Sequence, residues 1–167
     1  MKYTRLLIAA LLPLLLANCA SSGGAVSYTS APTAGATLNA ADRVSVTVIP
    51  APGMTAEEKS RLTSTISSVL DKKRAGLSGP GRPVSITVQM TRYDKGNAFA
   101  RAMLAGLGQI HIDASVAATN NATRATVMSF PVKKTFAWGG MVGAATQISD
   151  VEVGFAEKIA GGLTGKN

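Results

Sequence analysis

The sequence has very few of the residues from which catalytic and metal sites are most often built. Its 167 residues include one cysteine, one histidine and one tryptophan. A single cysteine excludes an intrachain disulfide, and one histidine with well-separated acids supplies too few donors for a metal site. We therefore expect no metal, no cofactor and no small-molecule substrate.

Acidic residues are also scarce, because 17 Lys and Arg residues face 9 Asp and Glu residues, a net charge of +8. Removing residues 1–18, which contain Lys2 and Arg5, leaves 15 basic residues and a net charge of +6. This charge suits an anionic neighbourhood such as phospholipid head groups, and it equally suits simple solubility. No motif combines basic and aromatic residues, so no nucleic-acid partner is expected.

Long apolar runs are absent except near the start, where Leu6–Leu16 is an uninterrupted apolar stretch. It is too short to span a bilayer, which needs about 20 apolar residues. The basic residues before it and the small residues after it predict an export signal peptide over residues 1–18.

The only cysteine directly follows this signal. Leu16, Ala17 and Cys19 resemble the lipobox of bacterial lipoproteins, and Asn18 stands where Gly, Ala or Ser is usual. The resemblance implies cleavage before Cys19, a diacylglyceryl group on its sulfur, and an acylated amino group. Since Ala20 is not the Asp that retains lipoproteins in the inner membrane, it also implies the outer membrane of a Gram-negative bacterium. The alternative is an ordinary secretory signal, cut after Cys19 or Ala25, which would release an unlipidated effector.

Ala20–Ala41 has no charged residue and consists mostly of small and polar residues. This composition predicts a lipidated flexible tether over residues 19–42, followed by one periplasmic domain over residues 43–167.

Four segments of the domain alternate apolar and polar residues as strands do, near residues 44–48, 84–91, 110–116 and 128–133. Pro131 predicts an edge or bulged strand, and Asn120–Asn121 predicts a hairpin turn. Helices are predicted from the capping box of Thr55 and Glu58 to Gly76, and from that of Ser149 and Glu152 to Gly161–Gly162. The order β-α-β-β-β-α predicts an α+β, two-layer sandwich, with a four-stranded mixed sheet and two helices on one face.

The other face of this sheet is predicted to be a flat, polar platform. It carries His111, Asp113 and Ser115 on one strand, which leaves open a periplasmic hydrolase that uses His111 and Asp113. The same platform suits self-association through the sheet or binding of an envelope protein.

Asp94–Gly108 is glycine-rich and lies between two strands, so it is either a functional loop or a short amphipathic helix with Phe99, Met103 and Leu107 on one face. Its Gly96-Asn97, Arg101 and Gly106-Leu107-Gly108 pattern, with the Gly139-Gly140 to Gly143 segment, resembles the DUF4410 family of small bacterial lipoproteins. The resemblance covers about Arg43–Leu163. It departs at Thr119–Thr126, where the family tends to have an acid and a glycine.

That family resemblance implies fold and location but no activity. We assign a candidate binding loop to five residues, Gly96, Asn97, Arg101, Gly106 and Gly108. Arg101 is interpreted as either an anion contact or a buried fork that fixes the loop, and we favour the fork. The function predicted from sequence is a non-enzymatic outer-membrane lipoprotein, whose tethered periplasmic domain binds another envelope component.

Overall fold

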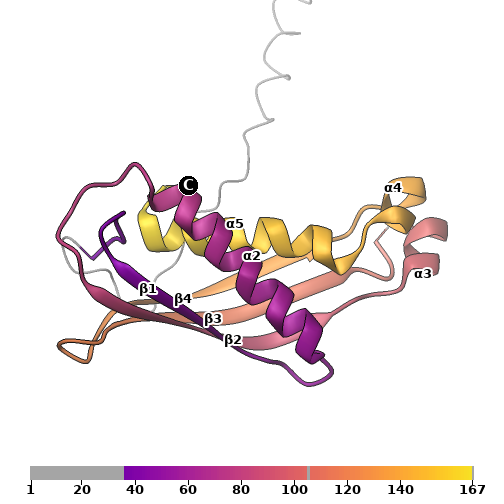
Figure 1. Cartoon of the computed structure of the whole chain (residues 1–167). Coiled ribbons are helices and arrows are strands. Elements are labelled where there is room, and N and C mark those ends of the chain that lie inside the picture. Colours follow the sequence, from indigo (N-terminus) through magenta and orange to yellow (C-terminus); the bar gives the residue numbers. More distant parts are fainter. Residues whose placement is uncertain (1–35, 105, 167) are drawn as a thin grey trace, which may run out of the picture.

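The computed structural model describes residues 36–104 and 106–166, and its order of elements is shown in Figure 1. The elements are β1 (Arg43–Ile49), α2 (Ala56–Arg74), β2 (Pro83–Asp94), α3 (Ala98–Met103), β3 (Ile110–Asn120), β4 (Ala125–Phe136), α4 (Gly140–Ala145) and α5 (Ile148–Thr164). The signal segment, Cys19 and most of the expected tether lie outside the described residues. No helix among the described ones combines the length and apolar character needed to cross a membrane.

The four strands form one mixed sheet in the order β1-β2-β3-β4. β1 and β2 are parallel and are joined through α2, whereas the β2–β3 and β3–β4 pairs are antiparallel. Helices α2 and α5 lie side by side over one face of the sheet (Figure 1). The predicted α+β sandwich is therefore confirmed, and the short helices α3 and α4 are additions at one end of it.

The core lies between this sheet face and the two long helices. Val88, Val116 and Phe130 point into it from three neighbouring strands, and Ile66 and Phe155 meet them from α2 and α5. All five are almost fully buried. The three strand residues share this side because alternation along each strand places every second residue towards the helices.

The start of α2 matches the sequence prediction. The Thr55 side chain accepts a hydrogen bond from the Glu58 N–H at 3.2 Å, and the Glu58 carboxylate accepts one from the Thr55 N–H at 2.9 Å. This reciprocal pair satisfies two backbone donors that no helical carbonyl reaches.

The limits of α5 differ from the prediction. The capping box is formed by Gln147 and Asp150 instead of Ser149 and Glu152. The helix also continues through Gly161–Gly162 and ends at Gly165, whose φ of 68° is left-handed. These two glycines are buried inside the helix, and a side chain at Gly162 would collide with the Phe130 ring, so glycine here permits close packing instead of ending the helix.

Two features of the antiparallel half are as predicted. Pro131 lies on β4, an edge strand of the sheet, where its missing N–H costs no ladder hydrogen bond. The β3–β4 hairpin turns at Asn120–Asn121, and the Asn120 side chain accepts a hydrogen bond from the Ala122 N–H at 2.9 Å.

The packed domain begins earlier than the predicted boundary at residue 43. Leu38 is fully buried, and its N–H donates to the Leu163 carbonyl at 2.8 Å. Asn39 and Asp42 are buried as well. Residues 36–42 therefore belong to the fold, and the composition of this stretch concealed the single large apolar residue that attaches it.

Candidate functional site

Helices α3 and α4 pack against each other at the end of the sheet where β2 passes to β3 (Figure 1). Seven large apolar side chains of this region are exposed, and we call them the apolar tip: Phe99, Met103, Leu104, Leu107, Trp138, Met141 and Val142. Met141 is 90% exposed, Phe99 75% and Trp138 70%. The helix predicted within Asp94–Gly108 is present as α3, but its apolar residues face outward instead of packing on the sheet.

Arg101 holds the two segments of the tip together. It is 3% exposed, and its guanidinium donates to four backbone carbonyls: Gly143 at 2.8 Å, Gly108 at 2.8 Å, Thr146 at 2.9 Å and Lys95 at 3.3 Å. Gly143 and Thr146 lie at the end of α4, where carbonyls lack helical donors and carry partial negative charge. This is the geometry of a loop-fixing fork, and it occupies the guanidinium with the protein's own oxygens.

The other residues of the candidate loop support the same arrangement. The Asn97 side chain caps α3 by accepting from the Ala100 N–H at 3.0 Å, and the Asn97 N–H donates to the Gly108 carbonyl at 3.1 Å. Gly96 and Gly108 both have positive φ. A side chain on Gly96 would collide with the backbone of Gly108, and one on Gly108 would collide with the backbone of Asn97. Gly106 also has positive φ but faces open space. The structure thus brings Gly96, Asn97, Arg101 and Gly108 together, and their role in binding stays a prediction.

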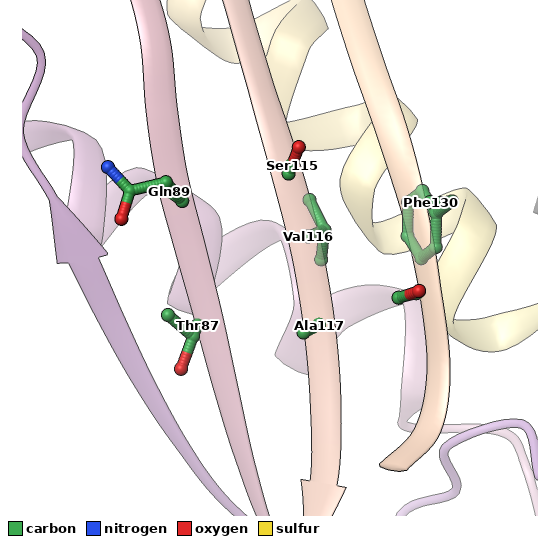
Figure 2. Close-up of a pocket in the computed structure, with 7 residues that line it drawn as sticks. Thr87, Gln89, Ser115, Val116, Ala117 and Phe130 are labelled. Atoms are coloured by element: carbon green, nitrogen blue, oxygen red, sulfur yellow. The ribbon is translucent and has the colours of Figure 1, made fainter. Parts of the chain in front are cut away.

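The sheet face opposite the helices carries the predicted polar platform. Its centre has a shallow depression of about 210 Å³ (Figure 2), whose lining residues are Thr87, Gln89, Ser115, Val116, Ala117, Ser129 and Phe130. The small side chains of Ser115, Ala117 and Ser129 leave this hollow beside the longer Gln89.

His111 and Asp113 do not line the depression. The His111 ring lies 3.1 Å from the Thr135 hydroxyl, and Asp113 faces Arg92 and Lys133 across the neighbouring strands. Both therefore have partners on adjacent strands, and the structure does not place them with Ser115 around one enclosed space. Among the described residues, no three His, Cys, Asp or Glu side chains form a group that could hold a metal.

A buried polar cluster that the sequence did not reveal joins α2, β2 and α5. Glu152 is 1% exposed, and Arg61 binds both of its oxygens, with nitrogen–oxygen distances of 2.8 and 3.0 Å. The Tyr93 hydroxyl donates to the same carboxylate at 2.5 Å. Burial and this hydrogen bond to Glu152 both raise the pKa of Tyr93 well above its usual value. Glu152 lies among the apolar residues that form the stripe of α5. This position in the sequence was the signal that could have predicted its burial.

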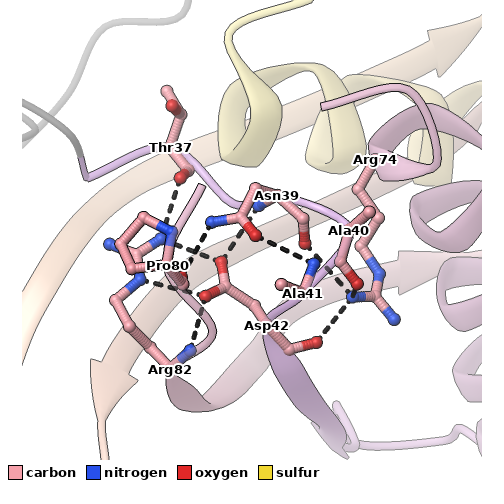
Figure 3. A network of polar contacts seen from close by, with 8 residues as sticks. All are labelled: Thr37, Asn39, Ala40, Ala41, Asp42, Arg74, Pro80 and Arg82. Atoms are coloured by element: carbon pink, nitrogen blue, oxygen red, sulfur yellow. Dashed lines mark hydrogen bonds and ion pairs between the residues drawn. The ribbon is translucent and has the colours of Figure 1, made fainter. Parts of the chain in front are cut away.

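Asp42 is the centre of a second buried cluster, at the end where the chain enters the domain (Figure 3). Its carboxylate accepts hydrogen bonds from the N–H groups of Asn39 and Arg82 and from the Arg82 guanidinium, which binds both oxygens at 3.0 and 2.8 Å. Burial alone would raise the pKa of Asp42, but the hydrogen bonds from Arg82 and Asn39 outweigh it and lower that pKa. Arg74 at the end of α2 donates to the Asp42 carbonyl at 2.6 Å, which ties this end to the helices.

These features define a small α+β domain with one sheet face that no described helix covers and an apolar tip fixed by a buried arginine. The chain belongs to the DUF4410 family, described as a domain of unknown function, whose model matches residues 54–140. This confirms the resemblance inferred from the sequence. Among curated proteins, no match was found.

The fold is shared with solved structures, two of which have TM-scores above 0.5. One is the PelC dodecamer from Paraburkholderia phytofirmans, with 15% identity, a TM-score of 0.58 and coverage of 84% of this chain and 99% of that chain. The other is a single-substitution variant of the same PelC dodecamer, with 16% identity, a TM-score of 0.56 and coverage of 83% and 95%. A minor lipoprotein from Acinetobacter baumannii matches more distantly, with 11% identity, a TM-score of 0.44 and coverage of 77% and 93%.

Proposed function

We propose that the chain is a lipid-anchored protein of the bacterial outer membrane, whose domain lies in the periplasm and assembles with envelope proteins, including further copies of itself. No catalytic activity is part of this proposal. The observation that carries it is the single cysteine, placed directly after a short apolar signal and before an uncharged stretch that leads to a folded domain.

The structure supports the proposal at two points. The chain enters the domain through a firmly bonded segment, since Asp42 attaches it to Arg82 and Arg74 attaches it to α2. An anchor at Cys19 would therefore be joined to the domain by a definite attachment. Self-association is motivated by PelC, which shares the fold and is a dodecamer.

The hydrolase alternative has less support. General base catalysis needs the base within hydrogen-bond reach of the nucleophile or its water, usually in a site that excludes bulk solvent. His111 instead lies beside the Thr135 hydroxyl on the bare face of the sheet.

Lipidation is tested by growing cells with an alkyne analogue of palmitate and measuring its incorporation into the full chain. We expect labelling of the natural chain and of a Ser21→Ala control, and none of Cys19→Ser. An unlabelled natural chain, with a mature amino terminus after Cys19 or Ala25, would contradict the anchor and favour the secreted alternative.

The membrane assignment is tested by separating inner and outer membranes on a density gradient. We expect the natural chain in the outer membrane and an Ala20→Asp variant in the inner membrane, because Asp at this position is the retention signal of lipoproteins. Equal distribution of the two would contradict the assignment. Chemical cross-linking of intact envelopes then tests assembly, and a chain recovered only as a monomer would contradict it.

A further inference from the structure

The apolar tip is larger than chance exposure accounts for. With residue areas of about 150–250 Å², the exposed fractions of its seven side chains correspond to an apolar area on the order of 800 Å². The largest apolar patch of a typical monomer is roughly 300–600 Å². About 800 Å² is what each partner contributes to a standard protein interface.

Charge distinguishes the tip from the rest of the chain. Residues 96–110 and 135–149 contain one charged residue, Arg101, and its guanidinium is buried. Without residues 1–18 the chain has a net charge of +6 and repels its own copies over most of its surface, so an uncharged surface is where two copies can approach.

The charges around the tip do not favour an anionic lipid surface. Surfaces that bind such membranes carry clusters of unpaired Lys and Arg beside their apolar residues. Here Lys95 pairs with Glu58 at 2.8 Å, and Arg92 pairs with Asp94 at 3.0 Å. These two cations next to the tip are thus each paired with an acid.

The N-terminal segment of the same chain does not enter the domain at the tip. The Leu38 N–H binds the Leu163 carbonyl at the end of α5, whereas the tip lies beyond the start of that helix (Figure 1). The 17 residues of α5 separate the two points by about 25 Å.

A partner for the tip must itself present apolar surface. Outside the tip, the exposed large apolar side chains among the described residues are Ile49 and Val153. The only apolar surface of matching size that a second copy offers within the described residues is its own tip. We infer that two copies of this chain associate tip to tip, in a two-fold contact where each buries Phe99, Trp138 and Met141 against the other. This inference rests on the self-association in the proposed function, and it moves the contact from the sheet face to the tip.

The first test is cross-linking at one position in envelopes that contain the full chain. Met141→Cys places a thiol at the tip, and Val153→Cys places one on α5 as a matched exposed control. The natural chain, with Cys19 alone, gives the background. With a short bis-maleimide we expect a cross-linked dimer for Met141→Cys, at least tenfold more abundant than for Val153→Cys.

A second test uses Trp138, the only tryptophan of the chain, as a reporter at the tip. The full chain is placed in vesicles of phosphatidylethanolamine and phosphatidylglycerol, with and without lipids that carry a fluorescence-quenching nitroxide. We expect the emission to move to shorter wavelength as the protein-to-lipid ratio rises, with no quenching by the nitroxide. The double variant Phe99→Ser/Met141→Ser should abolish this shift, while Val153→Ser should retain it.

Four outcomes overturn the inference. Quenching by nitroxide lipids would assign the tip to the membrane. A Met141→Cys chain that cross-links only to a different protein would assign the tip to that partner. Oligomers that persist in Phe99→Ser/Met141→Ser would place the contact elsewhere and leave the proposed self-association intact. The absence of any oligomer of the natural chain would contradict both the tip contact and the proposed self-association. Thermal unfolding of each variant checks that the exposed substitutions leave the fold unchanged.

Discussion

The two ends of this domain are each organised by one buried charge, but the charges have opposite sign and different partners. At the tip, the Arg101 cation is surrounded by four backbone carbonyls. At the entry end, the Asp42 anion is surrounded by N–H donors, and the Arg82 guanidinium provides a counter-ion. In both places one side chain gathers loops that have no regular hydrogen-bond ladder of their own.

The difference between the partners determines how each end responds to conditions. The partners of Arg101 are backbone carbonyls, so no carboxylate takes part in its contacts at the tip. The Asp42 cluster depends on an ionised carboxylate and must weaken in acid. The Arg101 contact therefore has no carboxylate partner to lose in acid, while the attachment of the chain to the domain through Asp42 is acid-sensitive.

The largest effect is expected from removing the cation. Arg101→Met approximately keeps the volume but removes a donor from four carbonyls, of which that of Gly108 still accepts from the Asn97 N–H, so we expect a loss of about 3 kcal/mol in the free energy of unfolding of the tip. Arg101→Lys should lose about half as much, because an ammonium cannot reach all four oxygens. Hydrogen exchange of residues 96–109 and 139–147 measures the effect. Unchanged protection there in Arg101→Met would contradict the role of the fork.

Removing the anion should cost less and depend on pH. Asp42→Asn should lower the free energy of unfolding by about 2 kcal/mol at pH 7. Because folding lowers the pKa of Asp42, its stabilising contribution is complete above about pH 4, the value in an unfolded chain, and disappears as the pH falls through the lower folded value.

The gap between natural chain and Asp42→Asn should therefore close in acid, whereas the gap for Arg101→Lys should not change through this contact. Urea unfolding between pH 3 and pH 7 measures both. Asp71→Asn, which alters an exposed ion pair with Arg74, serves as the control and should change stability by less than about 0.5 kcal/mol. A constant gap for Asp42→Asn would show that its carboxylate does not act as described.

Two glycines of α5, the helix that runs from the tip to the entry end, are expected to differ in their tolerance of a side chain. A Cβ at Gly162 would lie 2.6 Å from the Phe130 ring, so Gly162→Ala should cost about 2 kcal/mol through overpacking. A Cβ at Gly154 would meet only the movable end of Lys134, so Gly154→Ala should be neutral or stabilise by up to about 1 kcal/mol through helix propensity. Thermal unfolding distinguishes them, and equal effects would contradict the packing argument.

The smallest effect is expected at the β3–β4 hairpin, near the entry end. Arg124 has a φ of 59°, the left-handed conformation that glycine adopts most easily. Arg124→Gly should stabilise by about 0.5 kcal/mol, since the relief of strain is partly offset by the greater freedom of the unfolded chain. Arg124→Ala is the control and should give no gain.

Local patterns in the sequence were enough for the regular elements. Alternation predicted all four strands, the Thr55 and Glu58 spacing predicted the start of α2, and Pro131 predicted an edge strand. These predictions succeed because strand faces and helix caps depend on residues only a few positions apart. The predicted end of α5 was wrong because Gly162 packs against the ring of Phe130, a residue that is distant in the chain.

The candidate site was predicted only in part, for the same reason. The spacing of the glycines and Arg101 predicted a candidate loop. Burial of the Arg101 guanidinium was the interpretation favoured from the sequence. The outward direction of Phe99 and Met103, and their meeting with Trp138 and Met141, could not be deduced from spacing.

The sequence by itself determined the four strands, the two long helices, the mixed sheet and a single cysteine in a lipoprotein-like context. Only the tertiary structure decided that Leu38 belongs to the core, that Asp42 and Arg101 are buried charges at opposite ends, and that the apolar tip faces outward. Apolar periodicity predicts that one face of a helix is buried, but it does not identify the element that covers that face. Whether a charged side chain is buried depends on partners that are distant in the chain and that only folding brings within hydrogen-bond reach, such as Thr146, which is 45 residues from Arg101.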